Sequence, residues 1–219
     1  AGRQPAFRAL FIGGGGYTVP RYLETVYPQA HLLVAEIDPA VTAAAYAYMG
    51  LPTDTRVVTD NRDARLVLDE LVAAGARFDL VFGDAFNDLS VPYHLTTREV
   101  AAKLARLVTP GGAYLANVID NPARGEFMRA YAHTLRTAFP HLRVLSGPGG
   151  VGLDALATYV LVASHQPLAL DALDGTRGVR VIPEPQVAAW LARDRPLVLS
   201  DDYAPVDNLM APMFAERGY

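Results

Sequence analysis

The chain has 219 residues, of which 51% are hydrophobic and 19% are charged, and it carries a formal net charge of −4. This length and composition favour one domain with a large core, and the lack of cysteine excludes disulfides, thiolate metal sites and cysteine nucleophiles. The mildly acidic charge argues against nucleic acid as the main partner, because phosphate binding needs clustered lysine and arginine.

Short apolar runs alternate with longer alanine- and leucine-rich runs along most of the chain. The short β-branched and aromatic runs predict strands, and the longer periodic runs predict helices. Strands are expected at residues 8–13, 31–38, 56–60, 78–84, 113–120, 142–147 and 157–164. Helices are expected at residues 20–27, 39–48, 64–74, 97–107 and 125–139, with a turn at 109–112.

This alternation predicts an α/β fold with a doubly wound, seven-stranded, mostly parallel sheet, because parallel neighbours need crossover helices. The last two strands have no helix between them, so they predict a C-terminal antiparallel hairpin. Seven strands with such a hairpin are the layout of the class I methyltransferase-like fold. We expect residues 1–165 to form a nucleoside-binding domain and the proline-rich residues 166–219 to pack on it as an extension.

Four glycines follow the first predicted strand, in the stretch LFIGGGGYTVP. In open α/β sheets ligands bind at the carboxyl ends of strands, and the next helix offers unpaired N–H groups and its positive dipole end. Gly13, Gly14 and Gly15 are therefore candidates for a nucleoside-binding loop. A tight turn without a ligand remains the alternative.

Acidic residues stand at the ends of the second and third predicted strands. Glu36, about 22 residues after the glycines, is placed to accept hydrogen bonds from two ribose hydroxyls. Asp63 is placed to accept a hydrogen bond from the exocyclic amine of adenine, with Ala64 against the ring. A solvated carboxylate is the alternative for Glu36, and a helix N-cap is the alternative for Asp63.

The fourth predicted strand ends in Asp84, and Asp88 follows in the same loop. Two carboxylates near an adenosine site suit a cationic amine, because one can hold the ammonium while the other accepts its proton. The alternative is ordinary loop chemistry. The substrate-binding candidates are Asp88 and three aromatic residues, Tyr17, Tyr93 and His94.

In these motifs the chain resembles the spermidine synthase (polyamine aminopropyltransferase) family. The resemblance rests on IGGGGYTVPRYLE, AEID, the DA pair at Asp63 and FGDAF, and it covers roughly residues 7–164. It implies that Gly13, Gly14 and Gly15 line the donor site. It also implies that Glu36 holds the ribose, that Asp63 holds the adenine, and that Asp84 is the base.

The implied activity moves an aminopropyl group from decarboxylated S-adenosylmethionine to a polyamine or other amine. Gly16 and Tyr17 stand where the family usually has an acid, so S-adenosylmethionine and a small-molecule methyltransferase remain open. A non-catalytic nucleoside-binding domain of a larger membrane protein is the third alternative.

Other partners and the location of the chain follow from more general features. The scattered histidines predict no metal site. No apolar run reaches the roughly 18 residues of a membrane span, so we expect a cytoplasmic chain, tethered if a membrane part lies upstream. A homodimer is left open.

Overall fold

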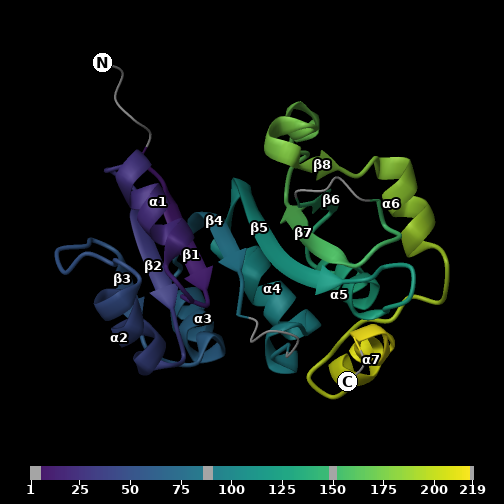
Figure 1. The fold of residues 1–219 in the computed structure, drawn as a ribbon, viewed down its shortest axis with the longest axis horizontal. Helices are drawn as coiled ribbons and strands as arrows, with labels where there is room; N and C mark the ends of the chain where they lie inside the picture. Colours follow the sequence, from purple (N-terminus) through teal and green to yellow (C-terminus); the bar gives the residue numbers. More distant parts are fainter. Residues whose placement is uncertain (1–5, 86–90, 148–151, 218–219) are drawn as a thin grey trace.

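The computed structural model of the chain describes residues 6–85, 91–147 and 152–217. These residues form an eight-stranded sheet in the order β3-β2-β1-β4-β5-β7-β6-β8 (Figure 1). The strands are β1 (Arg8–Ile12), β2 (His31–Ala35), β3 (Val58–Asp60), β4 (Phe78–Gly83), β5 (Val108–Asp120), β6 (His141–Ser146), β7 (Ala157–Ser164) and β8 (Arg180–Val181).

The sheet is parallel from β3 to β5, and β7 runs antiparallel to both β5 and β6. The predicted fold class is confirmed, including the C-terminal hairpin. The two-residue β8, which pairs with β6, is an addition that the sequence pattern did not predict. The turn expected at residues 109–112 is wrong, because these residues belong to β5, whose register against β4 shifts between Phe78 and Leu80.

Helices cover both faces of the sheet (Figure 1). They are α1 (Thr18–Val26), α2 (Pro39–Tyr48), α3 (Ala64–Ala73), α4 (Arg98–Leu107), α5 (Phe127–Leu135), α6 (Glu184–Leu191) and α7 (Val206–Arg217). Side chains of α1 and α2 form one core cluster with Phe11 and Val34. Side chains of α3, α4 and α5 form the other with Leu10 and Val81. Because neighbouring strand residues face opposite sides, α1 and α2 cover one face, and α3 to α5 cover the other.

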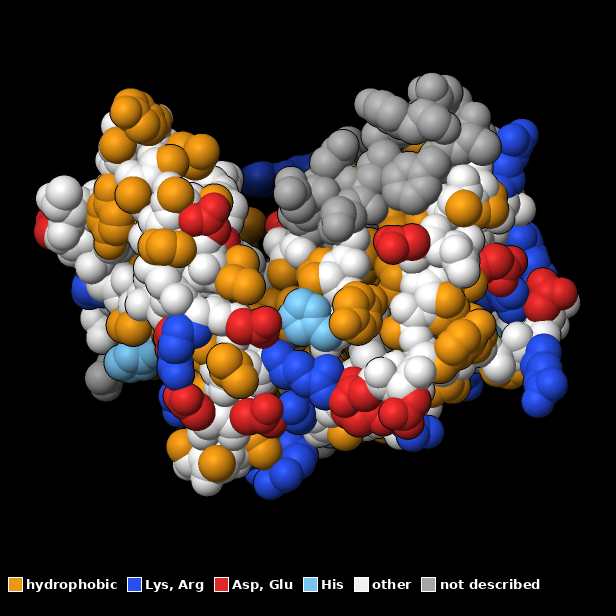
Figure 2. All heavy atoms as spheres, turned by 90° about the horizontal axis from the view of Figure 1, so that it is seen from below, with side chains coloured by type: hydrophobic (Ala, Val, Ile, Leu, Met, Phe, Trp, Pro, Cys, Tyr) orange, Lys and Arg blue, Asp and Glu red, His pale blue; other side chains and the backbone are white. Residues whose placement is uncertain are grey.

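The C-terminal segment folds back onto α5, where α6 and α7 pack. Trp190 of α6 is 2% exposed and belongs to the core. Farther along, the Arg65 guanidinium binds the Asp201 carboxylate, and Thr97 Oγ1 donates to Asp201 Oδ1 at 2.7 Å. This contact ties the C-terminal segment to α3 and α4. Figure 2 shows acidic and basic side chains interspersed on the lower face of the molecule.

The chain order places the switch point of the sheet between β1 and β4. From β1 the chain winds outward to β2 and β3, and it then returns to β4 on the other side of β1. At this edge, Gly13 N donates to Ala35 O and Asp84 N donates to Ile12 O, each at 2.9 Å. Ligands of open α/β sheets bind at this kind of edge, so the fold brings the glycine loop and Asp84 to the expected place.

Candidate functional site

The glycine loop after β1 is shaped by close backbone approaches. Gly13 has φ +97°, and a Cβ there would lie 2.4 Å from the carbonyl oxygen of Asp84. Gly15 has φ +46°, also in the left-handed region that favours glycine. The missing side chain at Gly13 therefore lets the loop meet the end of β4 directly, whereas a Cβ at Gly15 would meet no described atom within 4 Å.

Glu36, which follows β2 directly, holds this loop by hydrogen bonds. Its Oε2 accepts hydrogen bonds from Gly14 N at 2.7 Å and Gly15 N at 3.3 Å, and its Oε1 accepts from Asp38 N at 2.9 Å. The side chain of Asn61 donates to the Glu36 carbonyl at 3.0 Å. Glu36 is only 7% exposed, so a buried carboxylate is held in one orientation beside the loop.

A hollow of about 420 Å³ opens beside Glu36, and we call it the acid-lined hollow. This volume lies in the range of small-molecule sites. The ionisable side chains lining it are Glu36, Asp38, Asp63, Asp84 and His94. Among the described residues, its lining includes no lysine or arginine. The hollow is therefore rich in negative charge.

Asp63 and His94 meet at one side of the acid-lined hollow. Asp63 Oδ1 caps α3 by accepting from Arg65 N at 2.7 Å, and Asp63 Oδ2 lies 3.3 Å from His94 Nε2. The N-cap alternative for Asp63 is therefore realised, and the same side chain also lines the hollow beside Ala64. His94 lies with the candidate nucleoside residues and not at a separate substrate site.

Asp84 lies where the acid-lined hollow meets a second one. Its carboxylate is exposed, and its Oδ1 accepts a hydrogen bond from Asn117 Nδ2 at 2.8 Å. Asn117 was not among the residues predicted from the sequence, although its place near the end of a predicted strand next to an acidic strand end was a usable signal. Asp88 lies outside the described residues.

The second hollow, of about 310 Å³, lies between α1 and the sheet, and we call it the apolar hollow. Phe11, Phe82, Leu115 and Val160 line it from four strands. It shares Gly13, Gly15 and Asp84 with the acid-lined hollow.

Two predicted substrate residues lie elsewhere. Tyr17 is fully buried, and its hydroxyl is bonded to Thr42 Oγ1 at 3.0 Å and Thr59 Oγ1 at 3.2 Å. Its ring packs against the glycine loop, since a Cβ at Gly14 would lie 2.7 Å from the ring. The structure therefore contradicts a substrate-binding role for Tyr17. Tyr93 is 58% exposed and lines neither hollow.

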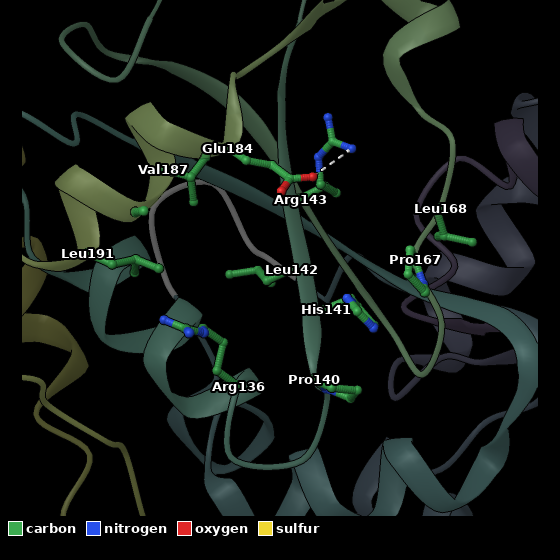
Figure 3. A pocket seen from close by; sticks show the side chains of 11 residues that line it. Arg136, Pro140, His141, Leu142, Arg143, Pro167, Leu168, Glu184, Val187 and Leu191 are labelled. Carbon is green, nitrogen blue, oxygen red and sulfur yellow. Dashed lines mark ion pairs between the residues drawn. The ribbon is translucent and has the colours of Figure 1, made fainter.

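A third hollow, of about 220 Å³, lies between α5, β6 and α6 (Figure 3). Arg143 points toward Glu184 there, with Nη1 3.3 Å from Oε1, and it also pairs with Asp171 at 2.5 Å. The described lining of this hollow has no residue in common with the other two, and Arg143 is already paired with two carboxylates. We do not count it as part of the candidate site.

Two features are absent from the described part of the chain. No helix there is long and apolar enough to cross a bilayer. The same residues hold no group of three or more histidine, aspartate or glutamate side chains that suits a metal ion.

No family model matches the chain. In sequence, it is 38% identical over 115 residues to the polyamine aminopropyltransferase of Vibrio vulnificus (strain CMCP6), a match covering 52% of this chain and 38% of the relative. The chain thus spans well under two thirds of the length of the curated relatives it matches.

Two solved structures share its fold. The crystal structure of a probable spermidine synthase from Corynebacterium glutamicum ATCC 13032 superposes with a TM-score of 0.74 at 22% identity, covering 91% of this chain and 74% of that one. The crystal structure of human methyltransferase-like protein 13 in complex with SAH superposes with a TM-score of 0.62 at 19% identity, covering 94% of this chain and 90% of that one.

Proposed function

We propose that this chain, a spermidine synthase-like domain with the methyltransferase fold, transfers an aminopropyl group from decarboxylated S-adenosylmethionine to an amine. The sequence likeness to a named polyamine aminopropyltransferase supports this proposal. The observation that carries it is the charge of the acid-lined hollow, where four carboxylates line the wall without a lysine or arginine among the described residues.

This charge favours the decarboxylated donor over S-adenosylmethionine itself. Decarboxylated S-adenosylmethionine carries a sulfonium and a terminal ammonium, whereas S-adenosylmethionine also carries a carboxylate. Like charges brought together across a site are unfavourable, and opposite charges are favourable. A wall of carboxylates therefore selects the donor that has no negative group.

The nucleoside part of the donor fits the residues around the glycine loop. Glu36 is fixed by three backbone N–H groups, and each carboxylate oxygen can accept more than one hydrogen bond, so it can also take the ribose hydroxyls. Asp63 would accept from the adenine amine, and Ala64 would pack against the ring. Gly13 and Gly15 both line the acid-lined hollow, and the open space beside Gly15 lets the donor lie against the backbone.

Asp84 would act as the general base. An amine is protonated at neutral pH, so the Asp84 carboxylate first takes a proton from its ammonium. The free lone pair then forms a bond to the aminopropyl carbon. The carbon–sulfur bond breaks with its electron pair going to sulfur, which releases neutral methylthioadenosine and a secondary ammonium. The protein contributes mainly alignment of nitrogen, carbon and sulfur.

Calorimetry and product analysis test the proposal together. We expect decarboxylated S-adenosylmethionine to bind at least tenfold more tightly than S-adenosylmethionine, and we expect methylthioadenosine to appear when an amine is added. Tighter binding of S-adenosylmethionine, with S-adenosylhomocysteine as the product, would instead establish a methyltransferase. Binding without either product would reject the transferase proposal.

A further inference from the structure

We propose that the apolar hollow is the acceptor site and that it takes an amine with one cationic end and an apolar body. The proposal rests on the proposed function for its reaction, but its occupant is argued from the shape and chemistry of this hollow. The hollow shares the lining residues Gly13, Gly15 and Asp84 with the acid-lined hollow. An acceptor there would meet the donor at a carboxylate.

The floor of the apolar hollow is a row of side chains in register across the sheet. Phe11 of β1 is opposite Phe82 of β4, and Phe82 is opposite Leu115 of β5. The two phenylalanine rings stack with centroids 4.7 Å apart and planes 3° from parallel. Val160 of β7 also lines the hollow, but it is opposite Asn117 of β5, two residues beyond Leu115. Phe82, Leu115 and Val160 are only half-buried, so the row presents apolar surface to the hollow.

The polar groups lie beside this row, two residues farther along β4 and β5 toward the carboxyl edge of the sheet. Asp84 comes two residues after Phe82, and Asn117 comes two residues after Leu115, so both lie on the same face of the sheet as the row. Their side chains are joined by the 2.8 Å hydrogen bond from Asn117 Nδ2 to Asp84 Oδ1. An ammonium bound at Asp84 therefore places the rest of its molecule next to the apolar row.

The charges lining the hollow decide between an acceptor with one cationic end and one with two. Among the described residues, Asp84 is the only ionisable side chain that lines it. A second ammonium along the row would lose its water over the phenylalanine rings without a carboxylate there to compensate, and burying an unpaired charge is costly. A methyl group at the same place would gain from apolar burial. The described lining thus favours an apolar monoamine over a diamine.

A matched pair of acceptors tests this inference. n-Pentylamine and 1,4-diaminobutane have the same number of heavy atoms and differ in whether one end is a methyl or an ammonium group. With decarboxylated S-adenosylmethionine as donor, we expect kcat/KM for n-pentylamine to exceed that for 1,4-diaminobutane at least tenfold. Methylthioadenosine release with a preference for the diamine would overturn the inference and leave the proposed function standing.

A charge placed in the row provides the reverse test. Leu115→Asp should shift the preference toward the diamine at least tenfold relative to Leu115→Asn, which has nearly the same shape without the charge. Val19→Glu makes the same test at an exposed position of α1 that lines the hollow and does not disturb the core. An unchanged preference in both charged variants would overturn the inference.

Binding alone tests the inference if no turnover occurs. In the presence of methylthioadenosine, n-pentylamine should shift the methyl NMR signals of Leu115 and Val160, and 1,4-diaminobutane at the same concentration should shift them much less. Loss of the Val160 shift in Leu115→Asp supports the site. No shift at either methyl group with n-pentylamine would reject the apolar hollow as its site, whatever reaction the chain performs.

Discussion

Replacing Glu36 by alanine should weaken nucleoside binding and also lower the stability of the fold. The nucleoside would lose two ribose hydrogen bonds to a carboxylate, each worth about 1.5 kcal/mol or more, so its affinity should fall about 100-fold, since about 1.4 kcal/mol is one factor of ten. The loop would also lose three backbone hydrogen bonds of 2.7, 2.9 and 3.3 Å. We therefore expect a loss of about 2–3 kcal/mol in the free energy of unfolding.

Calorimetry with methylthioadenosine and urea unfolding measure these two effects. Glu24→Ala is the matched control, because Glu24 also accepts from a backbone N–H, that of Arg56, at 2.6 Å, and from Thr55 Oγ1 at 2.7 Å, yet it lines neither hollow. This control should lose stability and keep its affinity within twofold. An affinity of Glu36→Ala within twofold of the wild type would refute the role given to Glu36.

Two further predictions concern contacts that the sequence did not reveal. Asn117→Ala should lower kcat about tenfold or more with methylthioadenosine affinity unchanged, because Asp84 loses the hydrogen bond that orients it. Steady-state kinetics at saturating donor measure this, and an unchanged kcat would contradict the role given to Asn117. The Arg65 guanidinium lowers the pKa of Asp201 below its usual 3.8, so the folded state holds this proton less tightly than the unfolded chain. The pair therefore stabilises the fold fully above about pH 4 and loses its effect as pH falls further. Between pH 7 and pH 3 the melting temperature should fall less in Asp201→Asn than in the wild type. Equal falls in the two proteins would argue against the pair.

The sequence predicted the parts of the site that depend on local pattern. Apolar runs with glycine or an acid at their ends marked the carboxyl ends of the strands, and parallel pairing then placed Gly13, Glu36 and Asp84 along one edge. These inferences need only the periodicity of strands and the geometry of parallel sheets.

The remaining contacts depend on the packed structure. Asn117 meets Asp84 because of the register of β5 against β4, and that register shifts at an irregularity. Tyr17 lies next to the glycines in sequence, but its φ of +53° and its buried hydroxyl bonds turn it into the core. The helices α6 and α7 were not predicted, because both contain proline, at the first turn of α6 and at Pro212 inside α7.

The most direct test of the account measures methylthioadenosine release from decarboxylated S-adenosylmethionine by the wild type and by Asp84→Asn. A general base typically contributes about 10²–10⁴-fold, so the variant should release methylthioadenosine at least 100-fold more slowly while binding it with affinity within twofold of the wild type. Equal rates of release by the two proteins would contradict the central claim that Asp84 takes the proton of the attacking amine.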